Sequence, residues 1–346
     1  MKYTGNFRIT LDEQTEKGAD AFGRRAFRPE YYRPDAGLVD AVNTALVLNM
    51  PLLLMGEPGV GKSKLAESVS AEFGLGPPLK FFAKSVSSSR DLYYSYDAIG
   101  HFRAIQSRGA TETVSAAEFI NLSAFGQAIL KTHDPTHAPL KLPSFQSWKK
   151  QRSVVLIDEV DKAPRDFPND ILNELEDLFF EIAELPSSSG PVRVEVVRDP
   201  ELFPIVIITS NSEKDLPDAF LRRCVFYHIP FPSNPGRLQD IVKAHTGLLW
   251  RDQEILEKDA LECFLWLRER QTWVKPPSPA ELLDWIFVLS RKNDGLDFSL
   301  KVNREAAKAT LPALFKTKAD LSKASTIFDE WARPGTAPAA EEPLAS

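Results

Sequence analysis

Short apolar runs alternate with longer amphipathic segments over the first two thirds of the chain. Strands are predicted where apolar residues follow one another without interruption, over residues 52–55, 80–83, 154–157 and 204–209. Helices are predicted where apolar residues recur three and four apart, over residues 38–46, 62–73, 116–130 and 166–182. Valines alternate with charged residues over 192–196, which predicts a half-exposed strand of a hairpin. Together the pattern predicts an α/β fold with a parallel sheet flanked by helices.

The pattern changes after Pro230-Phe231-Pro232. From there onward we find only helical periods, over residues 237–245, 259–268, 280–291 and 304–315. A smaller all-α domain is therefore expected over residues 233–332. The sequence divides further into an N-terminal arm (1–29), an α/β domain (30–232) and a disordered tail (333–346).

Composition narrows the class of protein. The chain has 346 residues and a net charge of −6, which argues against nucleic-acid binding and against attraction to anionic membranes. Its N-terminus is polar and its apolar stretches are too short to cross a bilayer, so we expect no membrane insertion. The two cysteines, Cys224 and Cys263, lack metal-ligand spacing and are expected to be buried thiols. These observations predict a cytoplasmic protein.

Eight residues between a predicted strand and a predicted helix follow the phosphate-loop pattern G-x-x-x-x-G-K-[ST]. They are Gly56, Glu57, Pro58, Gly59, Val60, Gly61, Lys62 and Ser63. Glycines let successive backbone N–H groups turn toward one anion, and the helix that follows adds its positive dipole end. We expect Lys62 to reach the β- and γ-phosphates of a nucleotide, and the Ser63 hydroxyl to bind Mg²⁺.

Two acids follow the apolar run Val154–Ile157. Asp158 and Glu159 are therefore predicted at the carboxyl end of a buried strand, where α/β proteins bind their ligands. Asp158 is expected to hold Mg²⁺, and Glu159 to orient and deprotonate the attacking water. A buried strand with a solvated acidic end is the alternative interpretation, which the phosphate loop makes less attractive.

Polar residues also follow the run that ends at Thr209. Asn211 is expected to contact the γ-phosphate or to position water, although it could instead cap the short helix 218–221. Arg222 and Arg223 come at the end of that helix, and an arginine can stabilise transition-state charge on a neighbouring subunit's nucleotide. A surface ion pair is the alternative. The sequence leaves open which arginine acts.

The ordered set of phosphate loop, acidic strand end, asparagine and arginine pair resembles the AAA+ ATPases, and within them the MoxR-like ATPases. Three stretches carry the closer resemblance, at residues 91–98, 157–164 and 217–224. The resemblance implies a P-loop NTPase (AAA+) fold with an all-α lid domain, ATP and Mg²⁺ as ligands, and a hexameric ring. It also implies an arginine supplied in trans and a chaperone-like role, with a von Willebrand factor A domain protein as a possible partner.

The chain departs from a minimal AAA+ core in two respects. Inserts are predicted near residues 100–150 and 185–200, and we regard them as surfaces that face a partner. Ala280 and Glu281 stand where AAA+ proteins often carry a sensor arginine in the lid, and Lys275 is the candidate to replace it.

Two other functions are compatible with the same motifs. The chain could be an ATP-gated scaffold in which hydrolysis only resets assembly, or a motor subunit of a defence or restriction complex. The complete set of hydrolytic residues favours turnover over a scaffold, and the negative charge disfavours a nucleic-acid motor. No motif in the sequence distinguishes adenine from guanine. The resemblance favours ATP over GTP. The client protein is not readable from the sequence.

Overall fold

The computed structural model describes residues 1–6, 28–108, 114–187, 190–211, 216–246, 254–270, 273–292 and 298–333. Among these, residues 1–6, 34–56 and 62–229 form one compact unit, and residues 28–33, 57–61 and 230–333 form a second. Most of the predicted N-terminal arm and nearly all of the predicted tail lie outside the described residues.

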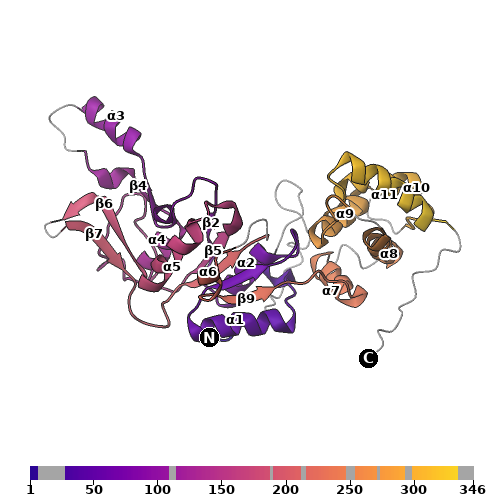
Figure 1. The fold of residues 1–346 in the computed structure, drawn as a ribbon, viewed down its shortest axis with the longest axis horizontal. Coiled ribbons are helices and arrows are strands. Elements are labelled where there is room, and N and C mark those ends of the chain that lie inside the picture. The colour runs from indigo at the N-terminus through magenta and orange to yellow at the C-terminus, as the bar shows by residue number, and fades with distance from the viewer. Residues whose placement is uncertain are drawn as a thin grey trace. The chain divides into compact units, whose positions relative to one another are not determined.

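The first unit is built on a five-stranded sheet of order β2-β5-β8-β1-β9 (Figure 1). Every neighbouring pair in it is parallel. Its strands are β1 (Leu52–Met55), β2 (Leu79–Phe82), β5 (Val154–Asp158), β8 (Ile205–Thr209) and β9 (Val225–His228). The predicted parallel α/β fold is therefore confirmed. β9 was not predicted.

Sheet register brings the functional strand ends to one edge. All five residues of β8 are buried, as are the first four of β5, because both strands lie inside the sheet with neighbours on either side. Helix α1 (Ala36–Leu48) contacts β9 and β1, while α2 (Lys62–Glu72) contacts β5 and β8. Parallel pairing of β5, β8 and β1 places their carboxyl ends side by side.

An insert follows β2. Its strands β3 (Tyr94–Tyr96) and β4 (Ile120–Leu122) pair antiparallel, after the 3₁₀ turn η3 (Ser89–Leu92). Helix α3 (Ala98–Arg108) lies between these two strands in the sequence. It extends away from the five-stranded sheet (Figure 1).

The helix predicted over residues 116–130 is wrong in its first half. The segment contains a 3₁₀ turn η5 (Ala116–Phe119), then β4, then α4 (Ala124–Leu130). Ile120 and Leu122 are buried on the same face of β4, so pairing with β3 overrides the helical period.

The helix predicted over residues 166–182 ends early. Helix α5 (Phe167–Asp177) is followed by Leu178 in the left-handed region, with φ of 51°, which stops the helix. The chain continues as β6 (Phe179–Ser187), which pairs antiparallel with β7 (Gly190–Glu195). This pairing confirms the hairpin predicted around the alternating valines. A short 3₁₀ turn η6 (Val160–Lys162) and helix α6 (Asp218–Leu221) complete the unit.

The second unit is helical, as predicted. After η2 (Pro29–Tyr31) its helices are α7 (Pro235–Thr246), α8 (Glu254–Arg270), α9 (Pro279–Lys292), α10 (Arg304–Lys308) and α11 (Lys318–Trp331). Phe264, Trp285 and Phe328 are fully buried in its core. The single helix predicted over 304–315 is wrong: it breaks after Lys308 into η8 (Leu311–Ala313), where Pro312 cannot donate a helical hydrogen bond. Across the described ranges, no helix is both long and apolar enough to span a membrane.

Candidate active site

The phosphate loop links β1 to α2. Gly56, Gly59 and Gly61 adopt positive φ angles of 147°, 78° and 100°. The Lys62 side chain is 7% exposed, and its ammonium donates a hydrogen bond of 2.8 Å to the Gly56 carbonyl. That bond holds the ammonium against the backbone at the first residue of the loop.

The middle of the loop belongs to the second unit, where two glycines are required sterically. A Cβ at Gly59 would collide with the Ser278 side chain, and one at Gly61 would lie 3.1 Å from the Tyr32 ring. In the same unit, Arg268 donates to the Glu57 carboxylate at 2.5 Å and to the Pro277 carbonyl at 2.6 Å. Sequence reasoning missed Arg268.

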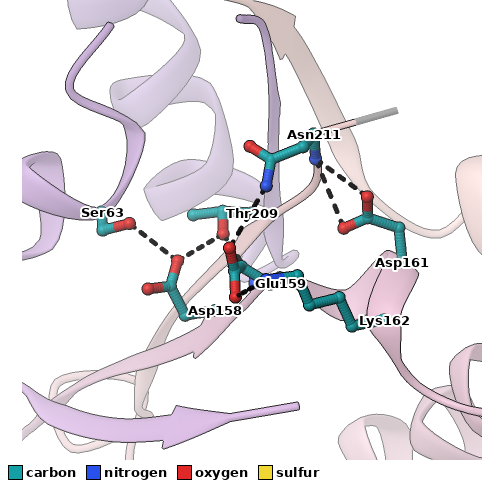
Figure 2. Close-up of polar contacts among 7 residues, drawn as sticks. All are labelled: Ser63, Asp158, Glu159, Asp161, Lys162, Thr209 and Asn211. Carbon is teal, nitrogen blue, oxygen red and sulfur yellow. Dashed lines mark hydrogen bonds and ion pairs between the residues drawn. The ribbon is translucent and has the colours of Figure 1, made fainter. Parts of the chain in front are cut away.

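Two hydroxyls from two elements of the first unit meet at the carboxylate of Asp158, which comes from a third (Figure 2). The Ser63 hydroxyl at the start of α2 donates to Asp158 Oδ1 at 2.7 Å. The Thr209 hydroxyl at the end of β8 donates to the same oxygen at 2.5 Å. Asp158 itself is the last residue of β5. Adjacent parallel strands and the loop from β1 thus bring together residues distant in the sequence.

Glu159 lies next to this group. Its backbone adopts the left-handed conformation, with φ of 59° and ψ of 49°, and its N–H donates to the Thr209 hydroxyl oxygen at 2.9 Å. A non-glycine residue in this region carries strain, which persists where surrounding contacts hold it. Thr209 therefore supports both acids: it donates to the Asp158 side chain and accepts from the Glu159 backbone.

The Glu159 carboxylate has two partners (Figure 2). Lys162 Nζ lies 2.6 Å from Oε2, and Asn211 Nδ2 donates to Oε1 at 3.3 Å. The Asn211 backbone N–H donates to both carboxylate oxygens of Asp161, at 3.3 and 3.2 Å. Asp161 is 2% exposed, so a buried carboxylate anchors the asparagine.

The structure thus brings Ser63, Asp158, Glu159 and Asn211 together, as the sequence pattern predicted for a single site. Arg222 and Arg223 end α6 with exposed side chains, and among the described residues the network of Figure 2 includes neither of them. Lys275 is also exposed, and its backbone N–H donates to Asp320 at 3.1 Å.

Sequence reasoning gave no role to Thr209, Asp161 or Lys162. A signal for Thr209 was present, since it ends β8 two positions before Asn211, at the same sheet edge as Asp158. Lys162 stands three positions after Glu159, which is a spacing that one tight turn brings together. The contact of Asp161 with a backbone N–H has no signature in the sequence.

The donor set at Asp158 suits a hard divalent cation. Ser63 Oγ and Asp158 Oδ1 are oxygens 2.7 Å apart beside the phosphate loop. Mg²⁺ prefers such oxygens and commonly uses one or two carboxylates together with substrate phosphates and water.

Neither cysteine contributes a nucleophile. Burial raises the pKa of the Cys224 thiol to about 12, and it raises the pKa of the fully buried Cys263 well above its ordinary value. Both are therefore thiols rather than reactive thiolates at neutral pH.

Comparison with known proteins identifies the family of the chain. Residues 52–232 match the model of the ATPase family associated with various cellular activities (AAA). No curated protein matches the chain in sequence.

Among solved structures, the chain has a match to NtrX from Brucella abortus in complex with ADP, at 14% identity and a TM-score of 0.43, covering 86% of this chain and 69% of that one. A RuvB variant from Thermotoga maritima is 16% identical, with a TM-score of 0.40 and coverage of 80% and 67%. The family assignment rests on the match of residues 52–232, which spans more than half of the chain. The chain belongs to the AAA family of ATPases, and it binds and hydrolyses ATP.

Proposed function

We propose that this protein is a MoxR-like AAA+ ATPase that hydrolyses ATP between the subunits of a ring and uses the energy to remodel or activate a partner protein. One observation carries the proposal. Ser63, Asp158, Glu159, Thr209 and Asn211 form a connected set of hydrogen bonds at one sheet edge, beside the phosphate loop. Such a set supplies a cation site, a base and a polar sensor in one place.

In this proposal the phosphate loop binds the nucleotide. The ammonium of Lys62 exchanges the Gly56 carbonyl for phosphate oxygens, and the first N–H groups of α2 face the same anion. Ser63 and Asp158, whose oxygens lie 2.7 Å apart, would hold Mg²⁺. When bound, Mg²⁺ neutralises charge on the β- and γ-phosphates.

Hydrolysis falls to the two residues beside Asp158. Glu159 takes a proton from the attacking water, and its carboxylate is 37% exposed, so water reaches it. Asn211 orients the γ-phosphate or that water through its amide. The anchoring of its backbone N–H to buried Asp161 keeps the amide in range while the side chain rotates.

Assembly into a ring would explain the exposed arginines. AAA+ proteins typically oligomerise. Arg222 and Arg223 follow the last residue of α6 and are exposed, as expected of a residue that completes a neighbour's site. We assign the role in trans to Arg223 and take a hexamer as the ring that the family resemblance implies.

The partner is proposed to meet the insert. Helix α3 exposes Ile99, Phe102 and Ile105, which share one side of the helix at a spacing of three. Exposed apolar side chains grouped in this way favour a protein partner over solvent. A von Willebrand factor A domain protein is the class that the resemblance suggests, and the cytoplasm is the compartment that two buried thiols suit.

The test is ATP turnover per subunit as a function of protein concentration. Specific activity should rise as subunits assemble and then plateau. In mixtures, Arg223→Ala subunits should regain activity with Lys62→Ala subunits, because each supplies what the other lacks. Arg222→Ala serves as the matched control, and rescue of that variant instead would move the role to Arg222. Absence of turnover at every concentration, with the partner class present, would favour an ATP-gated scaffold.

A further inference from the structure

We infer that Lys162 is a positioning residue for ATP hydrolysis: its ammonium fixes Oε2 of Glu159, so that Oε1 is the oxygen that takes the proton from water. The inference rests on the proposed role of Glu159 as the base. It adds a residue that lies outside the phosphate loop, the acidic pair and the asparagine, and whose contact is visible in Figure 2.

The pair is built into a single turn. Glu159 precedes η6 in the left-handed conformation, and the Lys162 N–H closes the turn by donating to the Glu159 carbonyl at 2.9 Å. The two side chains then leave the same turn and meet at 2.6 Å between Nζ and Oε2. Because the turn fixes the backbone of both Glu159 and Lys162, only their side-chain torsions remain to be ordered when the contact forms.

The two oxygens of Glu159 are held unequally. Oε2 accepts from a cation at 2.6 Å, whereas Oε1 accepts from a neutral amide at 3.3 Å. A base must bring one oxygen within hydrogen-bond reach of the attacking water. Both contacts have the carboxylate as acceptor, but the contact with Lys162 pairs two charges at 2.6 Å and the contact with Asn211 uses an uncharged donor at 3.3 Å, so the contact with Asn211 yields first. Oε1 becomes the reactive oxygen while Lys162 keeps Oε2 in place.

Binding of the nucleotide would release Glu159 Oε1 from its contact with Asn211. The Asn211 amide serves both Glu159 and, as proposed, the γ-phosphate or its water. Turning toward the phosphate breaks the 3.3 Å contact, and the Asn211 backbone stays bound to Asp161. Arrival of the phosphate thereby frees the base. Without Lys162 the carboxylate would be free to rotate once Asn211 left it.

The experiment compares Lys162→Met with Lys162→Arg in single-turnover and steady-state ATP hydrolysis. We expect Lys162→Met to lower kcat by about fivefold, the upper range for a partly exposed ion pair, with KM for ATP changed by less than about twofold. Lys162→Arg should recover most of kcat because it restores the cation. Lys80→Met is the control: it removes a lysine whose exposure is similar, 36% against 43%, and whose ion pair of 2.8 Å with Glu67 lies outside the site.

A double variant tests the role of Lys162 separately from the role of Glu159 as the base. In a Glu159→Gln background, Lys162→Met should cause no further loss, because the oxygen it orients is no longer a base. Independent, multiplicative losses would overturn the inference, and so would a kcat for Lys162→Met equal to that of Lys80→Met. Near-normal turnover by Glu159→Gln alone would instead reject Glu159 as the base. A melting temperature within a degree or two of the parent protein shows that loss of activity is not loss of fold.

Discussion

The acidic pair at the sheet edge of the first unit and Asp320 in the helical unit accept hydrogen bonds from different kinds of donors. At the sheet edge of the first unit, Asp158 accepts from two hydroxyls, and the Glu159 carboxylate accepts from an amide and an ammonium, all on side chains. In the helical unit, Asp320 accepts from the backbone N–H groups of Val274 and Lys275, at 3.0 and 3.1 Å. Side-chain donors can rotate toward a ligand, whereas backbone donors cannot leave without distorting the chain.

Asp259 of the helical unit accepts from one backbone donor and one side-chain donor. Its Oδ2 accepts from the Leu300 N–H at 2.9 Å and from the Ser299 hydroxyl at 2.7 Å. These buried acids of the second unit hold loops against helices. Asp259 and Asp320 thus each accept from at least one backbone N–H, whereas the carboxylates of Asp158 and Glu159 accept from side chains at the proposed site of reaction.

The largest effect should come from Lys62→Ala. Removing the ammonium leaves the phosphate charge without its partner, so ATP affinity should fall about 100-fold or more while the fold persists. Titration with a fluorescent ATP analogue measures the loss, with Lys80→Ala as a control of equal charge change. Unchanged affinity would show that the loop does not bind phosphate.

Asp320→Asn should act on stability instead. Burial alone would raise the pKa of Asp320, but hydrogen bonds from Val274, Thr317 and Lys275 outweigh it and lower that pKa. Replacing the carboxylate should lower the free energy of unfolding by about 2 kcal/mol. Thermal melts followed by circular dichroism measure the change.

The same lowered pKa fixes the sign of a pH dependence. The stabilising contribution of Asp320 is complete above its unfolded pKa near 4, and it is lost as the pH falls through the lower folded value. Parent protein and Asp320→Asn should therefore converge in stability in acid. A constant difference at every pH would remove the carboxylate from the explanation.

Thr209→Val should produce a smaller, catalytic effect. Valine keeps the shape of threonine but removes the hydroxyl that contacts both acids, so kcat should fall about tenfold with little change in melting temperature. Thr209→Ser restores the hydroxyl and should recover most of the activity. Equal kinetics for the valine and serine variants would show that the hydroxyl is dispensable.

The smallest effect should be the reaction of the two cysteines with a thiol reagent. Each cysteine reports on the unit in which it lies. Cys224 lies in the first unit and Cys263 in the second, and both thiols are buried. Neither should react with a thiol reagent in native buffer at neutral pH. In the Asp320→Asn variant, labelling at low denaturant should reach Cys263 before Cys224, as mass spectrometry of peptides would detect.

Local patterns predicted the elements that bury apolar residues within one segment. Strand β1 occupies the four residues that the apolar run 52–55 indicates, and α6 occupies 218–221 as expected. Predictions were wrong where pairing between distant segments decides the structure, as at Ile120–Leu122, whose strand depends on Tyr94–Tyr96. Leu178 and Pro312 end helices that periodicity alone would extend.

In the active site too, residues set by local patterns were predicted, and contacts between distant segments were not. The phosphate loop and the acidic pair follow patterns set by chemistry and local spacing, and the structure places Ser63, Asp158, Glu159 and Asn211 together. The supporting contacts depend on the fold. The bond from Thr209 to Asp158 exists because β5 and β8 are neighbours, and the bond from the Asn211 backbone to Asp161 depends on the turn after β5.

The position of β1 in the sheet has a consequence for synthesis on the ribosome. Leu52 pairs with Ile207 on one side and with Val225 on the other, so both neighbours of the strand are made much later than the strand itself. At about 5–20 residues per second, the apolar segment waits on the order of ten seconds for its partners. During that interval Leu52, Leu53 and Leu54 need protection from other nascent chains. A nascent chain that ends before β9 should therefore bind general chaperones strongly, and one that includes it should release them.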